Sequence, residues 1–191
     1  MSPTDISKRV LIVDDEPDIC NSLSEALQSE GWVVRCCLDG AAVLPLVREF
    51  DPAVVILDLK MPKVDGVKVL LNLREASPWV QTVVLTGHGG EEDAIACLNG
   101  HAFGYLQKPA SRESLLQMCD QALKNVPPAL LGFHRWYQAI SDPDRVLYTT
   151  AAGQNVTARQ LCEEIRQQTP LGQEFIGQVT EVAAELIVKR L

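Results

Sequence analysis

The feature that most constrains the fold is a regular alternation of short apolar runs with longer amphipathic segments over the first two thirds of the chain. Each run has the length of a strand and is bounded by turn residues, which indicates a buried β-strand. The segments between the runs carry apolar residues at helical spacing. Strands that alternate with helices form βαβ units, whose crossovers place helices on both faces of a parallel sheet. The sequence therefore predicts a doubly wound α/β fold with five parallel strands.

The expected strands occupy residues 10–13, 32–36, 53–57, 82–85 and 105–107. The expected helices occupy residues 17–29, 41–49, 67–76, 91–98 and 111–126. Pro17 and Gly31 are typical of the start and the end of the first helix, and Ser111 is the expected N-cap of the fifth. Two consecutive prolines, Pro127 and Pro128, then remove backbone donors and disfavour a continuous helix. We therefore place a domain boundary between residues 1–126 and 127–191.

The second segment is expected to fold as a small all-α domain. Helical spacing covers residues 129–140, and Ser141-Asp142-Pro143-Asp144 predicts a turn. Thr157 and Gln160 have capping-box spacing, and Thr169-Pro170 is typical of a helix start. The last helix has an apolar face that must pack against another surface. This face consists of Leu171, Phe175, Val179, Val182, Leu186 and Ile187.

Composition argues against several classes of protein. A formal net charge of -8 disfavours nonspecific attraction to nucleic acid or to an anionic membrane. The chain contains neither an apolar stretch long enough to span a bilayer nor a secretory leader, so we expect a cytoplasmic protein with no membrane partner. The six cysteines lack the spacing of a zinc site, and we expect small, buried thiols in a reducing compartment.

Carboxylates follow two of the predicted strands. Asp14 and Asp15 come directly after residues 10–13, and Asp58 comes after residues 53–57. Open α/β sheets bind ligands at the carboxyl ends of their strands, so these side chains are expected to meet at one edge. Such a cluster requires a cation, and carboxylate oxygen is a ligand that Mg²⁺ prefers.

Further residues extend this pattern and carry a family resemblance. Met61-Pro62 and Asp65-Gly66 follow Asp58, Thr86-Gly87 follows the fourth strand, Tyr105 lies on the fifth, and Lys108-Pro109 comes after it. Together with the carboxylates, these elements resemble the receiver domain of two-component response regulators. The resemblance covers residues 8–126 and implies a flavodoxin-like sheet with the strand order 2-1-3-4-5.

The resemblance also implies a role for each of these residues. Asp58 is expected to accept a phosphoryl group from a histidine kinase or a phosphotransfer protein. Asp14, Asp15 and Asp58 would bind Mg²⁺ together with the backbone carbonyl of Lys60. Lys108 would pair with a carboxylate at rest and with a phosphate oxygen after phosphorylation. Phosphoryl transfer develops charge on oxygen atoms, which a cation, an ammonium group and a hydroxyl donor at fixed positions can neutralise.

Thr86 and Tyr105 would act as a switch that responds to phosphorylation. The hydroxyl of Thr86 would donate to the phosphoryl group, and Tyr105 would turn inward, which changes the surface around the fifth strand. In the family a cis peptide bond often precedes the residue that corresponds to Pro109. Lys60 and His88 occupy positions that tune dephosphorylation, although exposed loop positions explain both residues equally well.

The resemblance implies a protein that catalyses only its own phosphorylation and dephosphorylation, so we do not expect an enzyme with a separate substrate. It also allows a homodimer through the receiver. Taken singly, each residue has an ordinary structural explanation, such as a turn aspartate, a strand threonine or a solvated lysine. The combination of all of them at these positions favours the functional interpretation.

The output of the second segment is argued from charge. Residues 129–191 carry six lysines and arginines against seven aspartates and glutamates, whereas DNA affinity comes largely from basic side chains. A helix-turn-helix over residues 157–179 is an alternative, but its second helix would lack basic residues until Lys189. His134 could be a phosphotransfer histidine, which would make the chain a phosphorelay intermediate. We expect an unidentified protein effector and regard DNA as an unlikely partner.

Overall fold

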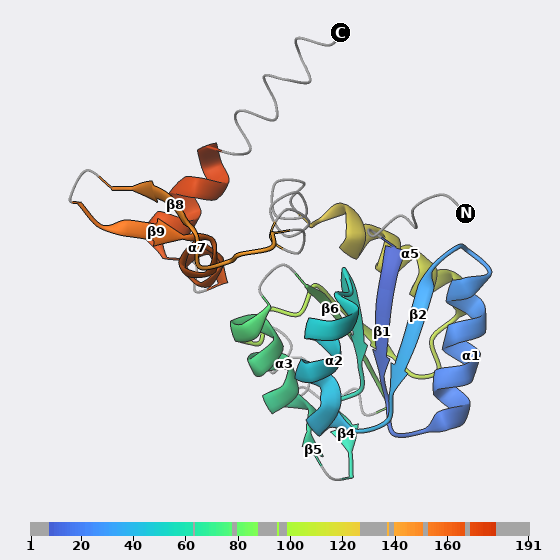
Figure 1. Cartoon of the computed structure of the whole chain (residues 1–191). Helices are drawn as coiled ribbons and strands as arrows, with labels where there is room; N and C mark the ends of the chain where they lie inside the picture. Colours follow the sequence, from blue (N-terminus) through green and yellow to red (C-terminus); the bar gives the residue numbers. More distant parts are fainter. Residues whose placement is uncertain are drawn as a thin grey trace, which may run out of the picture. The chain divides into compact units, whose positions relative to one another are not determined.

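The computed structural model describes the residues that build a five-stranded sheet and part of a second unit (Figure 1). The described residues are 8–62, 64–77, 80–87, 95, 99–126, 137, 140–150, 153–166 and 169–178. The chain divides into two compact units, Met1–Val126 and Pro127–Leu191. This division falls at the two consecutive prolines.

The first unit is a parallel sheet in the order β2-β1-β3-β6-β7, which confirms the predicted fold. Counted along the chain, these strands are first to fifth in the order 2-1-3-4-5. Their bounds are β1 Arg9–Val13, β2 Val33–Cys37, β3 Val54–Leu57, β6 Gln81–Thr86 and β7 Gly104–Gln107. A small antiparallel pair, β4 Lys60–Met61 and β5 Val64–Asp65, follows β3.

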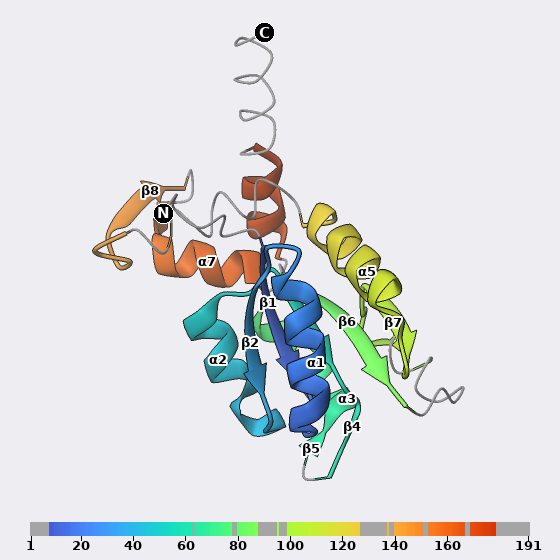
Figure 2. The same cartoon turned by 90° about the vertical axis from the view of Figure 1, so that its right-hand side faces the viewer.

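Helices lie on both faces of the sheet (Figures 1 and 2). α1 Pro17–Gln28 and α5 Arg112–Lys124 pack against each other and against one face, whereas α2 Val43–Phe50 and α3 Gly66–Ala76 pack together on the other side. A short 3-10 turn, Gly40–Ala42, precedes α2. The predicted helix over residues 91–98 lies outside the described residues except for Ile95.

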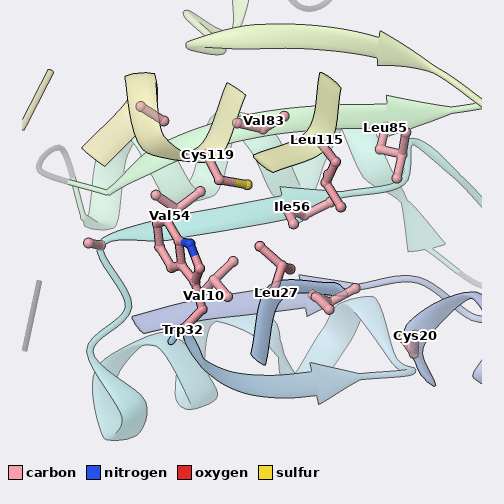
Figure 3. Packing of buried hydrophobic residues seen from close by; sticks show 13 residues of the cluster. Val10, Cys20, Leu27, Trp32, Val54, Ile56, Val83, Leu85, Leu115 and Cys119 are labelled. Atoms are coloured by element: carbon pink, nitrogen blue, oxygen red, sulfur yellow. The ribbon is translucent and has the colours of Figure 1, made fainter. Parts of the chain in front are cut away.

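The core explains why these strands could be located from apolar runs. β3 and the last four residues of β1 are buried, because helices cover both faces of the sheet. Alternate residues therefore face different helices: Val10, Val54 and Ile56 point into the cluster beneath α1 and α5 (Figure 3). Ser111 is the predicted N-cap of α5, since its Oγ accepts a hydrogen bond from the Ser114 N–H at 3.1 Å.

The second unit contains helices, as predicted, but it is not all helical. β8 Val146–Thr149 and β9 Asn155–Thr157 form an antiparallel hairpin. The sequence interpretation passed over a short run with strand-forming residues, which is followed by Gly153 at a positive φ of 80°. The predicted turn is present, since the Asp144 N–H donates to Asp142 Oδ1 at 3.1 Å.

Two helices of the second unit begin where the sequence indicates. α7 Ala158–Arg166 has a reciprocal cap: the Gln160 N–H donates to Thr157 Oγ1 at 3.2 Å, and the Thr157 N–H donates to Gln160 Oε1 at 3.0 Å. The Gly172 N–H donates to Thr169 Oγ1 at 3.2 Å at the start of the helix over residues 170–178. The predicted helix over 129–140, apart from Tyr137 and Ile140, and the chain beyond Gln178 lie outside the described residues.

Two expectations about membranes and thiols can be compared with this part of the chain. Within the residues that the structure describes, no helix is long and apolar enough to cross a bilayer. Five described cysteines are free thiols, and four of them are buried. Cys36 is exposed on the edge strand β2, so the expectation that the cysteines are buried is wrong at this position.

Candidate functional site

Four polar side chains gather at the carboxyl edge of the sheet because each follows or ends a parallel strand. Asp14 follows β1 and Asp58 follows β3, and the strand register pairs the residues just before them, Val13 with Leu57. Thr86 is the last residue of β6, and Lys108 follows β7. The sequence therefore brings together at one edge residues that are distant along the chain.

Asp58 is held rigidly and is only 6% exposed. Its N–H donates to the Val13 carbonyl at 2.9 Å, which extends the pairing of β1 and β3 by one residue. One carboxylate oxygen, Oδ1, accepts the Lys60 N–H at 2.9 Å. The other oxygen, Oδ2, accepts the Lys108 ammonium at 2.6 Å. Each carboxylate oxygen of Asp58 is therefore held by its own donor, Oδ1 by the Lys60 N–H and Oδ2 by the Lys108 ammonium.

Lys108 joins the two buried carboxylates. Its Nζ lies 2.6 Å from Asp14 Oδ2 and 2.6 Å from Asp58 Oδ2, while Glu16 Oε1 lies 4.0 Å away. Burial alone would lower the pKa of Lys108, but the hydrogen bonds to Asp14 and Asp58 outweigh burial, so the pKa is raised above the ordinary lysine value. Lys108 is therefore a cation at neutral pH.

The backbone around Lys108 fixes its direction. The Lys108 N–H donates to the Thr86 carbonyl at 2.9 Å, and this bond continues the pairing of β6 and β7. The Lys108–Pro109 peptide bond is cis, as the resemblance predicted. Lys108 follows β7, on the far side of β6 from β1 and β3, and its ammonium contacts Asp14 and Asp58 across the strand ends.

Three carboxylates lie close enough together to hold a cation. Oxygen atoms of Asp14, Asp15 and Asp58 lie within 4.8 Å of one another, and this is the only such group among the described residues. Asp14 is 2% exposed and its Oδ1 accepts the Glu16 N–H at 3.0 Å, whereas Asp15 is partly open to solvent. An all-oxygen ligand set with access to water suits Mg²⁺, so the residues fit the predicted metal.

The two predicted switch residues lie on neighbouring strands. Thr86 is fully buried at the end of β6. Tyr105 lies on β7, paired in register with Val84, and its hydroxyl oxygen is shielded from solvent.

Other predicted residues are placed less directly. Lys60 has an exposed side chain and forms part of β4, and its N–H contacts Asp58, whereas the role of its carbonyl stays a prediction. His88 and His134 lie outside the described residues.

Two further residues lie beside the site. Glu16 follows Asp14-Asp15, and the sequence predicted three or four carboxylates at this edge; the structure places Glu16 Oε1 4.0 Å from Lys108 Nζ but, of these carboxylates, groups only Asp14, Asp15 and Asp58 as a cation site. Gly66 is required by close packing: a Cβ there would lie 2.5 Å from the Leu59 Cα and 2.7 Å from the Asp58 carbonyl oxygen. Its backbone thus supports the loop that carries Asp58, and the Asp65-Gly66 pair was the available signal.

Comparisons with known proteins agree with this geometry. The family model of the response regulator receiver domain matches residues 10–120. Transcriptional regulatory protein GlrR of Escherichia coli K12 is 34% identical over 131 residues, which cover 69% of this chain and 29% of GlrR. Regulatory protein AtoC of the same organism is 26% identical over 178 residues, covering 88% of this chain and 39% of AtoC.

A solved structure matches the first unit. The solution structure of the beryllofluoride-activated NtrC4 receiver domain dimer has a TM-score of 0.60 and 34% identity, and the match covers 63% of this chain and 99% of that chain. This chain spans less than half the length of the two curated relatives. The family model ends at residue 120 and does not include the second unit.

Proposed function

Because this chain belongs to the response regulator receiver domain family, we propose that Asp58 accepts a phosphoryl group from a histidine kinase or a phosphotransfer protein. The observation that carries the proposal is the placement of Asp58 between Lys108 and a group of three carboxylates. Neither an isolated strand-end aspartate nor a surface ion pair would need this arrangement. The reaction class is phosphoryl transfer to a carboxylate.

The residues of the site perform distinct parts of this reaction. An oxygen of Asp58 attacks phosphorus, the P–N bond of the donor phosphohistidine breaks, and the electron pair stays on the imidazole nitrogen. Asp14, Asp15 and Asp58 would bind Mg²⁺ with the Lys60 carbonyl, and the metal would neutralise charge on the phosphoryl oxygens. Lys108 already contacts Asp58, so its ammonium can turn from the carboxylate to a phosphoryl oxygen.

The only group that this site would modify covalently is its own Asp58. It catalyses phosphorylation and hydrolysis at Asp58 and has no separate substrate. The phosphoryl group adds negative charge beside Thr86, whose hydroxyl would donate to it. Tyr105 would then turn inward, and the surface around β7 and α5 would change.

The first test is direct phosphorylation of the full chain. We expect incubation with acetyl phosphate and Mg²⁺ to label the wild type and to leave Asp58→Ala unlabelled, as measured by intact mass. Asp144→Asn is the matched control, because Asp144 is an exposed aspartate of the second unit. Removal of Mg²⁺ with EDTA should abolish labelling. Equal labelling of Asp58→Ala and the wild type would contradict the assignment.

We propose that the second unit is the output and that it acts through protein contacts. Support comes from the nearly balanced charge of residues 129–191, which offers few cations for a nucleic acid backbone. The described part of the unit buries Val156, Leu161, Cys162 and Ile165 in a small core of its own. A lysate pull-down with the beryllofluoride-activated chain, beside Asp58→Ala, should recover a protein partner only with the active form.

DNA binding is the second candidate function. It is favoured by GlrR, whose name is transcriptional regulatory protein, so the expectation that DNA is an unlikely partner is not supported. Binding to DNA fragments should be measured over a range of salt concentrations. Phosphate contacts would give an affinity that falls steeply with salt, whereas a protein-binding unit would give no such dependence.

A homodimer through the receiver is a further part of the proposal, supported by the dimeric NtrC4 receiver domain. Light scattering of the chain with and without beryllofluoride should show a larger mass in the activated sample. An unchanged mass at micromolar protein concentration would contradict the proposed dimer, whereas the phosphorylation proposal would be unaffected.

A further inference from the structure

Two thiols from different elements meet on one face of the sheet. Cys20 lies in the first half of α1, and Cys36 lies on the edge strand β2. Cys36 Sγ lies 3.7 Å from the Cys20 carbonyl oxygen, so the exposed thiol contacts the backbone of the residue that carries the buried one. α1 runs along β2 in both orthogonal views (Figures 1 and 2). The contact is therefore between neighbouring elements of one unit.

A hydroxyl group completes this thiol pair. Ser24 lies one helical turn after Cys20, and its Oγ donates to the Cys20 carbonyl at 2.6 Å. The same Oγ lies 3.2 Å from Cys36 Sγ. Either atom can be the donor in this contact. If Cys36 becomes oxidised, the hydroxyl can turn and donate to the new sulfenic oxygen.

The two thiols differ in exposure in a way that suits a stepwise oxidation. Cys36 is exposed, whereas Cys20 is 2% exposed. The remaining described cysteines offer no comparable pair. Cys37 donates to the Asp39 carbonyl at 3.0 Å and, as the next residue of the strand, faces the other side of the sheet. Burial raises the pKa of both the Cys20 and the Cys119 thiols to about 12, so the exposed partner thiol Cys36, rather than the pKa, distinguishes Cys20 from the fully buried Cys119.

We propose that Cys20 and Cys36 are a redox modification site. A peroxide-class oxidant would convert the two thiols into a reversible disulfide between them. The Cys36 sulfur attacks the peroxide, the O–O bond breaks, one water leaves, and Cys36 becomes a sulfenic acid. The Cys20 sulfur then attacks the Cys36 sulfur, the S–O bond breaks, and the hydroxide leaves with the Cys20 proton as a second water. The two thiols supply the two electrons that reduce the peroxide.

The modification would lie one helical turn from the carboxylate cluster. The Cys20 thiol donates to the Asp14 carbonyl at 3.5 Å, and the Cys20 N–H donates to the Glu16 carbonyl at 3.1 Å. A disulfide removes the Cys20 thiol proton and therefore the hydrogen bond to the Asp14 carbonyl. The carboxylate of the same residue is a proposed Mg²⁺ ligand. This second step rests on the proposed metal site. We expect the oxidised chain to bind Mg²⁺ about threefold more weakly.

The disulfide is tested on the full chain with hydrogen peroxide. We expect a mass lower by two hydrogen atoms, the loss of two alkylatable thiols, and recovery of both with dithiothreitol. Digestion without reduction should give one linked peptide pair, which contains Cys20 and Cys36. Persistence of both thiols, or a link between other cysteines, would overturn the proposal.

Variants separate the two chemical steps. In Cys36→Ser the disulfide should be absent, and this exposed substitution does not disturb the core. In Cys20→Ala, Cys36 should accumulate as a sulfenic acid that dimedone traps, because the second thiol is missing. Cys37→Ser is the matched control and should oxidise like the wild type. A disulfide that forms at an unchanged rate in Cys36→Ser would contradict the assignment even if Cys20→Ala failed to fold.

Coupling to the metal site has its own measurement. Calorimetric titration with Mg²⁺ should give the weaker affinity only in the oxidised wild type, and reduction should restore it. An unchanged affinity in fully oxidised protein would overturn the coupling. If neither redox form binds Mg²⁺, the proposed metal site fails, and peptide mapping still decides the disulfide.

Discussion

The two units place the same kinds of contact in different surroundings. In the first unit an ammonium bridges two buried carboxylates, since Lys108 contacts Asp14 and Asp58 and its side chain is only 15% exposed. In the second unit Arg159 donates two hydrogen bonds to Asp144, at 2.6 and 3.0 Å, but the side chain of Arg159 is 60% exposed and that of Asp144 is 65% exposed. Burial, rather than distance, separates a site from a surface ion pair.

The strands differ in the same manner. β3 is buried along its whole length between β1 and β6, whereas β8 has β9 as its single partner strand within the described residues, and its own residues are exposed or partly exposed. A strand that is covered on both faces must be apolar throughout, whereas a hairpin on a small core needs few buried residues. The difference explains why apolar runs located the sheet of the first unit and missed the hairpin of the second.

The largest effect is expected from removing the buried cation. Lys108→Met leaves the buried carboxylates of Asp14 and Asp58 without a neutralising cation, so the free energy of unfolding of the first unit should fall by about 3 to 4 kcal/mol without Mg²⁺. Added Mg²⁺ should recover part of this loss. Urea unfolding followed by hydrogen exchange of β1 and β3 peptides measures the change.

The pH dependence of this loss has a definite sign. The pKa of Lys108 is raised in the folded state, so its contribution to stability is fully present below the ordinary lysine pKa and is lost only as pH rises through the folded value. With an ordinary lysine pKa of about 10.4, the difference between variant and wild type should be constant from about pH 6 to 9. Lys68→Met, at an exposed position of α3, is the control. Equal stability of Lys108→Met and Lys68→Met would contradict the importance of the buried pair.

A matched pair of substitutions compares the two cores. Val54 is fully buried in β3, and Val156 is 2% exposed in β9. Val54→Ala should lower the stability of the first unit by about 2.5 kcal/mol, and Val156→Ala should lower that of the second by about 1.5 kcal/mol, because a small core relaxes more easily around a cavity. Hydrogen exchange of peptides from each unit reports both values. A larger loss at Val156 would show that the smaller core is the more rigid one.

The sequence predicted best where local pattern and burial agree. Residues 10–13 and 53–57 are continuous apolar runs, and each leads directly into an aspartate of the site. The family resemblance, not a local pattern, predicted that Lys108 pairs with a carboxylate, and the structure shows that it contacts two, Asp14 and Asp58. The contact of Cys36 with the Cys20 backbone joins residues that are distant in the chain and depends on side-chain direction, which no local pattern encodes. Gly66 is similar, because its need for space arises only when the loop folds over Asp58. The hairpin was missed because its strands are short and only partly buried.

The contribution of a helix cap to stability should be similar in the two units, since the hydrogen bond of a cap lies within one turn of the helix. Ser111 accepts a hydrogen bond at the start of α5, and Thr157 does so at the start of α7. Ser111→Ala and Thr157→Ala should each lower the stability of their own unit by about 1 kcal/mol. The measurement is the same exchange experiment, with Ser111→Thr and Thr157→Ser as conservative controls. Losses that differ by more than twofold would show that tertiary packing modifies the caps.

The smallest effect is expected at the exposed ion pair. Arg159 lowers the pKa of Asp144 through a hydrogen bond, so any contribution to stability is present above the ordinary aspartate pKa and is lost as pH falls through the lower folded value. Asp144→Asn should therefore match the wild type within error in high salt at neutral pH. Any small loss seen in low salt should vanish in acid, below about pH 3. Circular dichroism during urea unfolding at two salt concentrations measures this. A salt-independent loss of stability as large as that of Lys108→Met would mean that exposure to solvent does not weaken the Arg159–Asp144 pair. Burial would then not explain the difference between this ion pair and the Lys108 contacts with Asp14 and Asp58.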